Sequence, residues 1–150
     1  MLIHRRRNPQ ALQRYTLRIM ARSKFAVADF SAVSAALKPI LGSHARKLHV
    51  IVDNDSEYTL VSAIQCPLPE KRGERIYFGA IKMGKAYVSF HLFPLYMNPD
   101  LVSTISPELK RRMQGKTCFN FKTIPEASLL KELKALTSAG FRIFRQRKWV

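Results

Sequence analysis

Hydrophobic residues change their spacing several times along the chain, and each change predicts a new element. After Asp29, apolar residues recur three and four positions apart, which predicts a helix capped by Asp29. Pro39 is expected to kink or end this helix, and Gly42 to close the segment. Two runs that alternate apolar and polar residues, 48–53 and 58–64, follow on either side of a polar turn. They predict an antiparallel hairpin.

The middle of the chain predicts a second hairpin followed by two short helices. Residues 66–74 contain two prolines and mixed charges, which is typical of a surface loop. Residues 75–82 and 86–93 form the next two strands, and the first of them is apolar on both faces, so we expect it near the centre of the sheet. Pairs of a capping residue and a proline at 98–99 and 106–107 each predict a short helix.

The last third of the chain completes a mixed fold. Gly115 is expected to end the second short helix, and residues 117–122 alternate as a fifth strand. Pro125 and Glu126 then begin a long helix. Its apolar stripe consists of Leu129, Leu133, Leu136, Gly140, Phe141 and Phe144. The chain is therefore predicted to be α+β, with an antiparallel sheet of about five strands packed by helices.

The composition fits one compact domain with basic ends. The chain has 150 residues, 47% of them hydrophobic, and a formal net charge of +16. Residues 1–28 contain seven basic and no acidic residues, and residues 142–150 contain four basic and no acidic ones. We therefore expect a basic extension over 1–28, a domain over 29–146 and a basic tail over 147–150.

The extension over 1–28 has three interpretations. The favoured one is that Met20 is the natural start and that residues 1–19 lie outside the domain. A mitochondrial or plastid presequence is the second, because the segment is rich in Arg and free of acidic residues. The third is a basic arm that binds a polyanion.

Several chemistries lack the residues that they need. Cys66 and Cys118 lie 52 residues apart, without disulfide or zinc-finger spacing, so a reducing cytoplasm is the expected location. No run of 18 apolar residues could span a membrane. Gly115-Lys116-Thr117 lacks the upstream glycine and the following helix of a phosphate-binding loop. The four histidines are scattered, so no metal site is predicted.

A candidate ligand site lies where two predicted strands could meet. Its members are polar or aromatic residues of these strands and their flanks: Tyr87, Ser89, His91, Tyr96, Lys116, Cys118 and Asn120. Lys116 would attract a small anionic ligand, while His91 and Asn120 would orient it by hydrogen bonds. Tyr87 and Tyr96 would form apolar walls with polar tips. The alternative, in which these side chains only satisfy one another within the sheet, stays open.

A second candidate is the basic cluster Lys110, Arg111 and Arg112, which we interpret as an anion patch. Together with Lys116 and the basic ends of the chain, it supports the rival function, nucleic-acid or polyanion binding. The strand aromatics interleave with few charges, so we expect most of them in the core. Cys118 and His91 could form a nucleophilic pair only if their strands are neighbours that face the same way. No catalytic constellation is found, and a non-enzymatic binding domain is the leading prediction.

A family resemblance rests on residues 77–81, 87–96 and 106–122 and on the closing Leu130-Lys131-Glu132-Leu133 with Gly140-Phe141. In these stretches the chain resembles the YdhG-like family, a bacterial domain of unknown function, over residues 29–146. The resemblance implies an α+β domain with an antiparallel sheet packed by helices. The best-known member is a frataxin-like iron chaperone, so the resemblance also implies iron handling as a third function.

Overall fold

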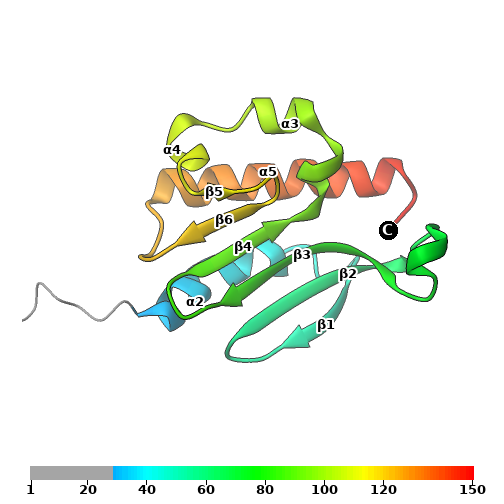
Figure 1. Cartoon of the computed structure of the whole chain (residues 1–150), viewed down its shortest axis with the longest axis horizontal. Helices are drawn as coiled ribbons and strands as arrows, with labels where there is room; N and C mark the ends of the chain where they lie inside the picture. Colours follow the sequence, from blue (N-terminus) through cyan, green and yellow to red (C-terminus); the bar gives the residue numbers. More distant parts are fainter. Residues whose placement is uncertain (1–28) are drawn as a thin grey trace, which may run out of the picture.

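The computed structural model describes residues 29–150, and Figure 1 shows their arrangement. The predicted extension over 1–28 and the alternative start at Met20 lie outside these residues. The first helix, α2 (Phe30–Gly42), begins where Asp29 accepts a hydrogen bond of 3.0 Å from the Ala32 amide. Pro39 lies inside this helix and does not end it. Buried side chains on both sides of Pro39 hold α2 against the sheet, and this packing outweighs the one backbone hydrogen bond that proline removes.

The predicted α+β fold is confirmed, with six strands in one antiparallel sheet rather than about five. The strand order is β1-β2-β3-β4-β6-β5. The strands are β1 (His49–Asp53), β2 (Glu57–Gln65), β3 (Arg75–Met83), β4 (Val88–Leu92), β5 (Met113–Gln114) and β6 (Cys118–Phe121). Both predicted hairpins are present, and β3 lies inside the sheet as expected.

The added strand, β5, replaces part of a predicted helix. The short helices α3 (Pro99–Ser103) and α4 (Pro107–Lys110) begin at their prolines as expected. The prediction that Gly115 ends the second of them is wrong, because α4 already ends at Lys110. Gly115 instead has a φ of +68° in the turn between β5 and β6, a conformation that glycine adopts without strain.

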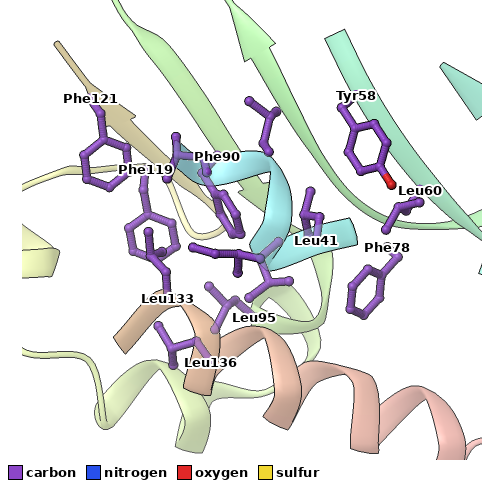
Figure 2. Close-up of a cluster of buried hydrophobic side chains, with 14 of the residues drawn as sticks. Leu41, Tyr58, Leu60, Phe78, Phe90, Leu95, Phe119, Phe121, Leu133 and Leu136 are labelled. Carbon is purple, nitrogen blue, oxygen red and sulfur yellow. The ribbon is translucent and has the colours of Figure 1, made fainter. Parts of the chain in front are cut away.

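One face of the sheet carries the hydrophobic core (Figure 2). The register places Tyr58, Ile81, Phe90 and Phe119 opposite one another across β2, β3, β4 and β6. Helix α2 packs closely on this face, since a Cβ at Gly79 would lie 3.2 Å from the Leu41 side chain. Among residues 29–150, no helix packs on the other face of the sheet, as Figure 1 shows. By the strand register, this face carries Lys82, Ser89, His91, Cys118 and Asn120.

The long helix α5 (Ala127–Gln146) packs on α2 and closes the core, and its Phe144 contacts Phe78 of β3 with ring centroids 5.0 Å apart. Its predicted stripe is buried apart from Phe141, which is half-buried and stacks on His44. Beyond α5 the chain turns back, and the Trp149 amide donates a 2.9 Å hydrogen bond to the Phe144 carbonyl. Trp149 and Val150 pack against the core, so the predicted basic tail over 147–150 has an apolar end. Two further 3-10 turns, η1 (Pro69–Lys71) and η2 (Phe93–Met97), follow β2 and β4.

Candidate functional site

The uncovered face of the sheet brings together four of the predicted ligand residues. In the register of β4 and β6, His91 lies opposite Cys118 and Ser89 lies opposite Asn120. Partners in an antiparallel pair point to the same side, so all four side chains share this face. We call this surface the sheet face and define it by these four residues with their neighbour Gln114, which lies opposite Cys118 in β5.

A chain of hydrogen bonds links the polar side chains of the sheet face. The Cys118 thiol donates to Asn120 Oδ1 at 3.3 Å, and Asn120 Nδ2 donates to Gln114 Oε1 at 2.8 Å. The Tyr87 hydroxyl reaches the same Gln114 oxygen at 3.4 Å. Gln114 was missed in the sequence because its strand has only two residues, too few to show alternation. These groups satisfy one another, which is the alternative that the sequence left open.

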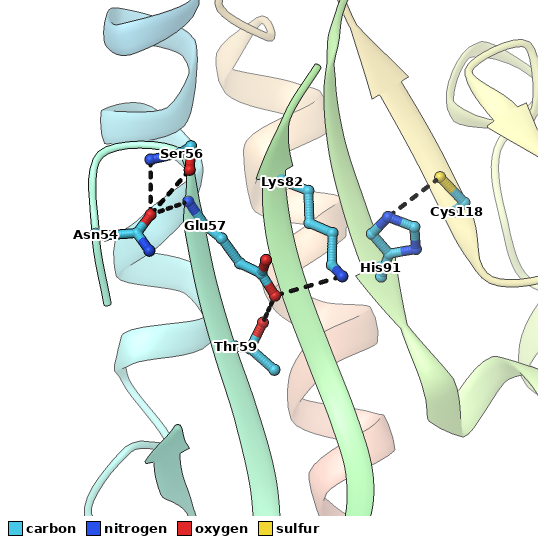
Figure 3. A network of polar contacts seen from close by, with 7 residues as sticks. All are labelled: Asn54, Ser56, Glu57, Thr59, Lys82, His91 and Cys118. Atoms are coloured by element: carbon cyan, nitrogen blue, oxygen red, sulfur yellow. Dashed lines mark hydrogen bonds and ion pairs between the residues drawn. The ribbon is translucent and has the colours of Figure 1, made fainter. Parts of the chain in front are cut away.

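Cys118 and His91 meet in the way that a nucleophilic pair would require, and burial favours the neutral form of each side chain. The Cys118 Sγ lies 3.9 Å from His91 Nε2, on the neighbouring strand (Figure 3). Burial lowers the pKa of His91, an effect reinforced by the charge of Lys82. Burial also raises the pKa of the Cys118 thiol. A resting thiolate is therefore disfavoured, and Cys118 would act as a nucleophile only if His91 took its proton.

The two remaining predicted residues, Lys116 and Tyr96, contact each other. The Lys116 Nζ lies 5.5 Å from the centroid of the Tyr96 ring, within cation–π range. Tyr96 is 60% exposed and stacks on Phe93 with ring centroids 6.1 Å apart. Lys116, in the turn that precedes β6, therefore places the predicted positive charge over the ring of Tyr96 in η2.

Two further charges on this side of the sheet, Glu57 and Lys82, pair with each other. Glu57 accepts a 2.6 Å hydrogen bond from the Thr59 hydroxyl and forms an ion pair of 3.3 Å with Lys82 (Figure 3). Both contacts lower the pKa of Glu57, with the Thr59 hydrogen bond the larger cause. This ion pair therefore adds no net charge beside the sheet face that could attract an anion.

A cavity lies elsewhere, at the predicted anion patch. Its volume is about 530 Å³, and it is bounded by the end of α4, the end of β6 and the start of α5. We call it the α4–α5 cavity. The residues that line it are Glu108, Arg111, Arg112, Phe121, Thr123, Ile124, Pro125, Glu126, Ser128 and Leu129. Lys110, the third member of the patch, is exposed and lies outside this lining.

Hydrogen bonds fix the walls of the α4–α5 cavity. Ser106 caps α4 by accepting from the Leu109 amide at 3.2 Å. The backbone amide and the hydroxyl of Ser106 both donate 2.7 Å hydrogen bonds to the carboxylate of Glu132 on α5. The Arg112 carbonyl accepts a 2.8 Å hydrogen bond from the Asn120 amide of β6. The segment that carries both arginines is thus attached to the helix and to the strand that bound the cavity.

The two arginines of the cavity differ in their partners. Arg111 forms an ion pair of 3.6 Å with Glu108, in which both side chains are more than half exposed. Such exposed pairs contribute only about 0–1 kcal/mol, so a ligand can displace this one at small cost. Arg112 has no ion-pair partner among residues 29–150.

Within residues 29–150, no three His, Cys, Asp or Glu side chains converge as a metal centre of several such ligands would require. In the same residues, no helix is long and apolar enough to cross a membrane. Comparisons with protein-family models, with curated proteins and with solved structures gave no match for this chain.

Proposed function

We propose that this protein is a non-enzymatic, YdhG-like binding domain that holds a small anionic ligand in the α4–α5 cavity. The observation that carries the proposal is the position of Arg111 and Arg112 on the wall of a hollow of about 530 Å³. This volume lies in the range of about 300–1,000 Å³ that is typical of small-molecule sites.

The chemistry of the lining suggests what the ligand looks like. Arginine guanidinium groups bind carboxylates and phosphates through paired hydrogen bonds. The hydroxyls of Thr123 and Ser128 can add further hydrogen bonds to the same oxygens. Ile124, which is 54% exposed, and Leu129 both line the cavity and provide apolar surface. We therefore expect a ligand with a carboxylate or phosphate group and a short apolar body.

The sheet face supports this role less well, although the sequence alone favoured it. Its amide, hydroxyl and thiol groups are hydrogen-bonded to one another, so a ligand would have to break those contacts. Lys116, the cation that the sequence predicted for this site, already lies over Tyr96. The α4–α5 cavity instead has hollow space and a guanidinium that lacks an ion-pair partner among the described residues.

Phenyl phosphate is a suitable probe, because it combines a phosphate with an apolar ring. Saturating phenyl phosphate should raise the melting temperature of the full chain, as any ligand that binds only the folded state does. Arg112→Gln should abolish most of the shift. Arg72→Gln is the matched control, since Arg72 is exposed in the loop before β3 and lies outside the cavity lining. A shift that Arg112→Gln leaves unchanged would reject the cavity as the binding site.

Polyanion binding is the second candidate, favoured by the exposure of Lys110, Arg111 and Arg112 on consecutive positions. It predicts affinity that falls steeply with salt, with a log–log slope of about −0.7 to −0.9 per phosphate contact. Most strand aromatics are in the core, Phe78, Phe90, Phe119 and Phe121 among them, which leaves few rings on which bases could stack. A slope near zero for a single-stranded oligonucleotide would exclude this candidate.

A further inference from the structure

We infer that Cys118 and His91 form a binding site for a soft metal ion, with Cu(I) the best match. The two side chains lie directly opposite each other on β6 and β4, and both point to the uncovered side of the sheet. The site is separate from the α4–α5 cavity, whose lining contains neither residue. This inference therefore does not rest on the proposed function.

The spacing of the two donor atoms fits an ion between them. Metal–sulfur bonds to thiolates are about 2.3 Å long and metal–nitrogen bonds to imidazoles about 2.0 Å, taking zinc as the reference. The distance of 3.9 Å between Cys118 Sγ and His91 Nε2 is shorter than the sum of these lengths, about 4.3 Å. An ion can thus contact both atoms in a bent arrangement without movement of either strand.

The backbone around the pair holds this spacing. His91 and Cys118 are register partners of paired strands, and the next residue, Leu92, donates a 2.8 Å hydrogen bond to the Thr117 carbonyl. Behind them, Phe90 and Phe119 are fully buried in the core. The two donors are therefore preorganised, which reduces the ordering cost of binding an ion.

The donor set selects the class of ion. Thiolate is a soft ligand that favours Cu(I) and Zn(II), and imidazole suits both ions. Hard ions such as Mg(II) and Ca(II) prefer oxygen ligands in larger numbers. No third His, Cys, Asp or Glu joins the pair in the described residues, so an ion that is stable with few ligands is favoured over the four-coordinate zinc of structural sites. Cu(I) meets both conditions.

Binding is a simple exchange of a proton for the metal ion. The Cys118 thiol, which now donates to Asn120 Oδ1 at 3.3 Å, releases its proton to solvent and forms the sulfur–metal bond. His91 Nε2 donates a lone pair and loses no proton in its neutral form with the hydrogen on Nδ1. No electron is transferred, since copper enters and remains as Cu(I).

The test is a competition for Cu(I) between the full chain and the coloured chelator bicinchoninate, without oxygen and with excess ascorbate. The wild type should remove one equivalent of copper from the chelator, which is read as loss of its absorbance. Cys118→Ser should remove none. Cys66→Ser, which removes the other cysteine of the chain, is the matched control and should behave as the wild type.

His91→Gln separates the proposed pair from a thiol that binds copper alone. It should weaken copper affinity by about tenfold or more, because one of two ligands is lost. Circular dichroism of each variant checks that it is folded. Equal copper uptake by wild type and Cys118→Ser, no uptake by the wild type, or unchanged affinity in His91→Gln would each overturn the inference.

Discussion

The sheet face and the α4–α5 cavity use polar groups in opposite ways. On the sheet face, Cys118, Asn120 and Gln114 hydrogen-bond one another across strands, and Tyr87 joins them through Gln114. In the cavity, Arg112 has no ion-pair partner among the described residues and faces a hollow. Side chains that hydrogen-bond one another across strands stabilise the sheet, whereas a guanidinium without an ion-pair partner can bind an anionic ligand.

The largest expected effect distinguishes the two sides of β6. Phe121 is 2% exposed and belongs to the core, while its neighbour Asn120 points to the sheet face. Phe121→Ala should lower the free energy of unfolding by about 3–5 kcal/mol, because it leaves a cavity in the core. Asn120→Ala should cost no more than about 1 kcal/mol. Urea unfolding measures both, and equal losses would contradict the assignment of the two faces.

The α4–α5 cavity and the sheet face with Lys116 are alternative binding sites for an anion, and one substitution in each distinguishes them. Arg112→Gln should weaken binding of phenyl phosphate by about tenfold or more, since hydrogen bonds to charged groups contribute about 1.5–3 kcal/mol. Lys116→Gln should leave the affinity unchanged. Isothermal titration calorimetry compares the two variants. The reverse result would place the ligand on the sheet face, where the sequence alone had predicted it.

Acid should weaken the fold through His44, which lies in neither surface. This imidazole stacks on Phe141 with ring centroids 4.6 Å apart, and burial lowers its pKa. The unfolded chain, with an ordinary histidine pKa of about 6.5, binds the proton more readily. The free energy of unfolding should therefore fall as the pH drops below about 6.5 towards the lowered pKa.

His44→Phe retains the ring stacking and removes the titrating group. Its free energy of unfolding should depend less on pH below about 6.5 than that of the wild type. Some dependence should remain, because burial also lowers the pKa of His91. Urea unfolding at a series of pH values measures the slope, and an identical slope in the variant would show that His44 is not responsible.

The smallest expected effect is a gain of affinity. Glu108 forms an exposed ion pair with Arg111 and competes with an anionic ligand for that guanidinium. Glu108→Gln should raise the affinity for phenyl phosphate by about twofold to threefold, in proportion to the small energy of such pairs. Glu70→Gln, an exposed change of equal charge in the loop before β3, is the control. A loss of affinity in Glu108→Gln would mean that the carboxylate helps to bind the ligand.

The sequence predicts the elements with a clear period well. Helices α2 and α5 and both hairpins follow from alternation and helical spacing, which are local properties of the chain. Strand β5 is missed because its residues, Met113 and Gln114, form no periodic pattern. Its pairing with β6 depends on a turn at Gly115 that the sequence placed at the end of a helix.

The candidate site is predicted only in part, because its parts are brought together over long range. Strands β4 and β6 are neighbours in the sheet although α3, α4 and β5 separate them in the chain. The side of each strand was predictable from alternation, but their adjacency was not. The α4–α5 cavity was not predictable either, since it depends on how Glu132 attaches α4 to α5. Only the charge of its arginines was visible in the sequence.

The position of Trp149 makes its fluorescence a probe of one end of the molecule only. It is the single tryptophan of the chain, and its ring lies against Phe144 at the carboxyl end of α5. The α4–α5 cavity lies at the other end of this 20-residue helix, which spans about 30 Å. Tryptophan fluorescence should therefore follow the release of the carboxyl terminus during unfolding and remain silent when the cavity is filled.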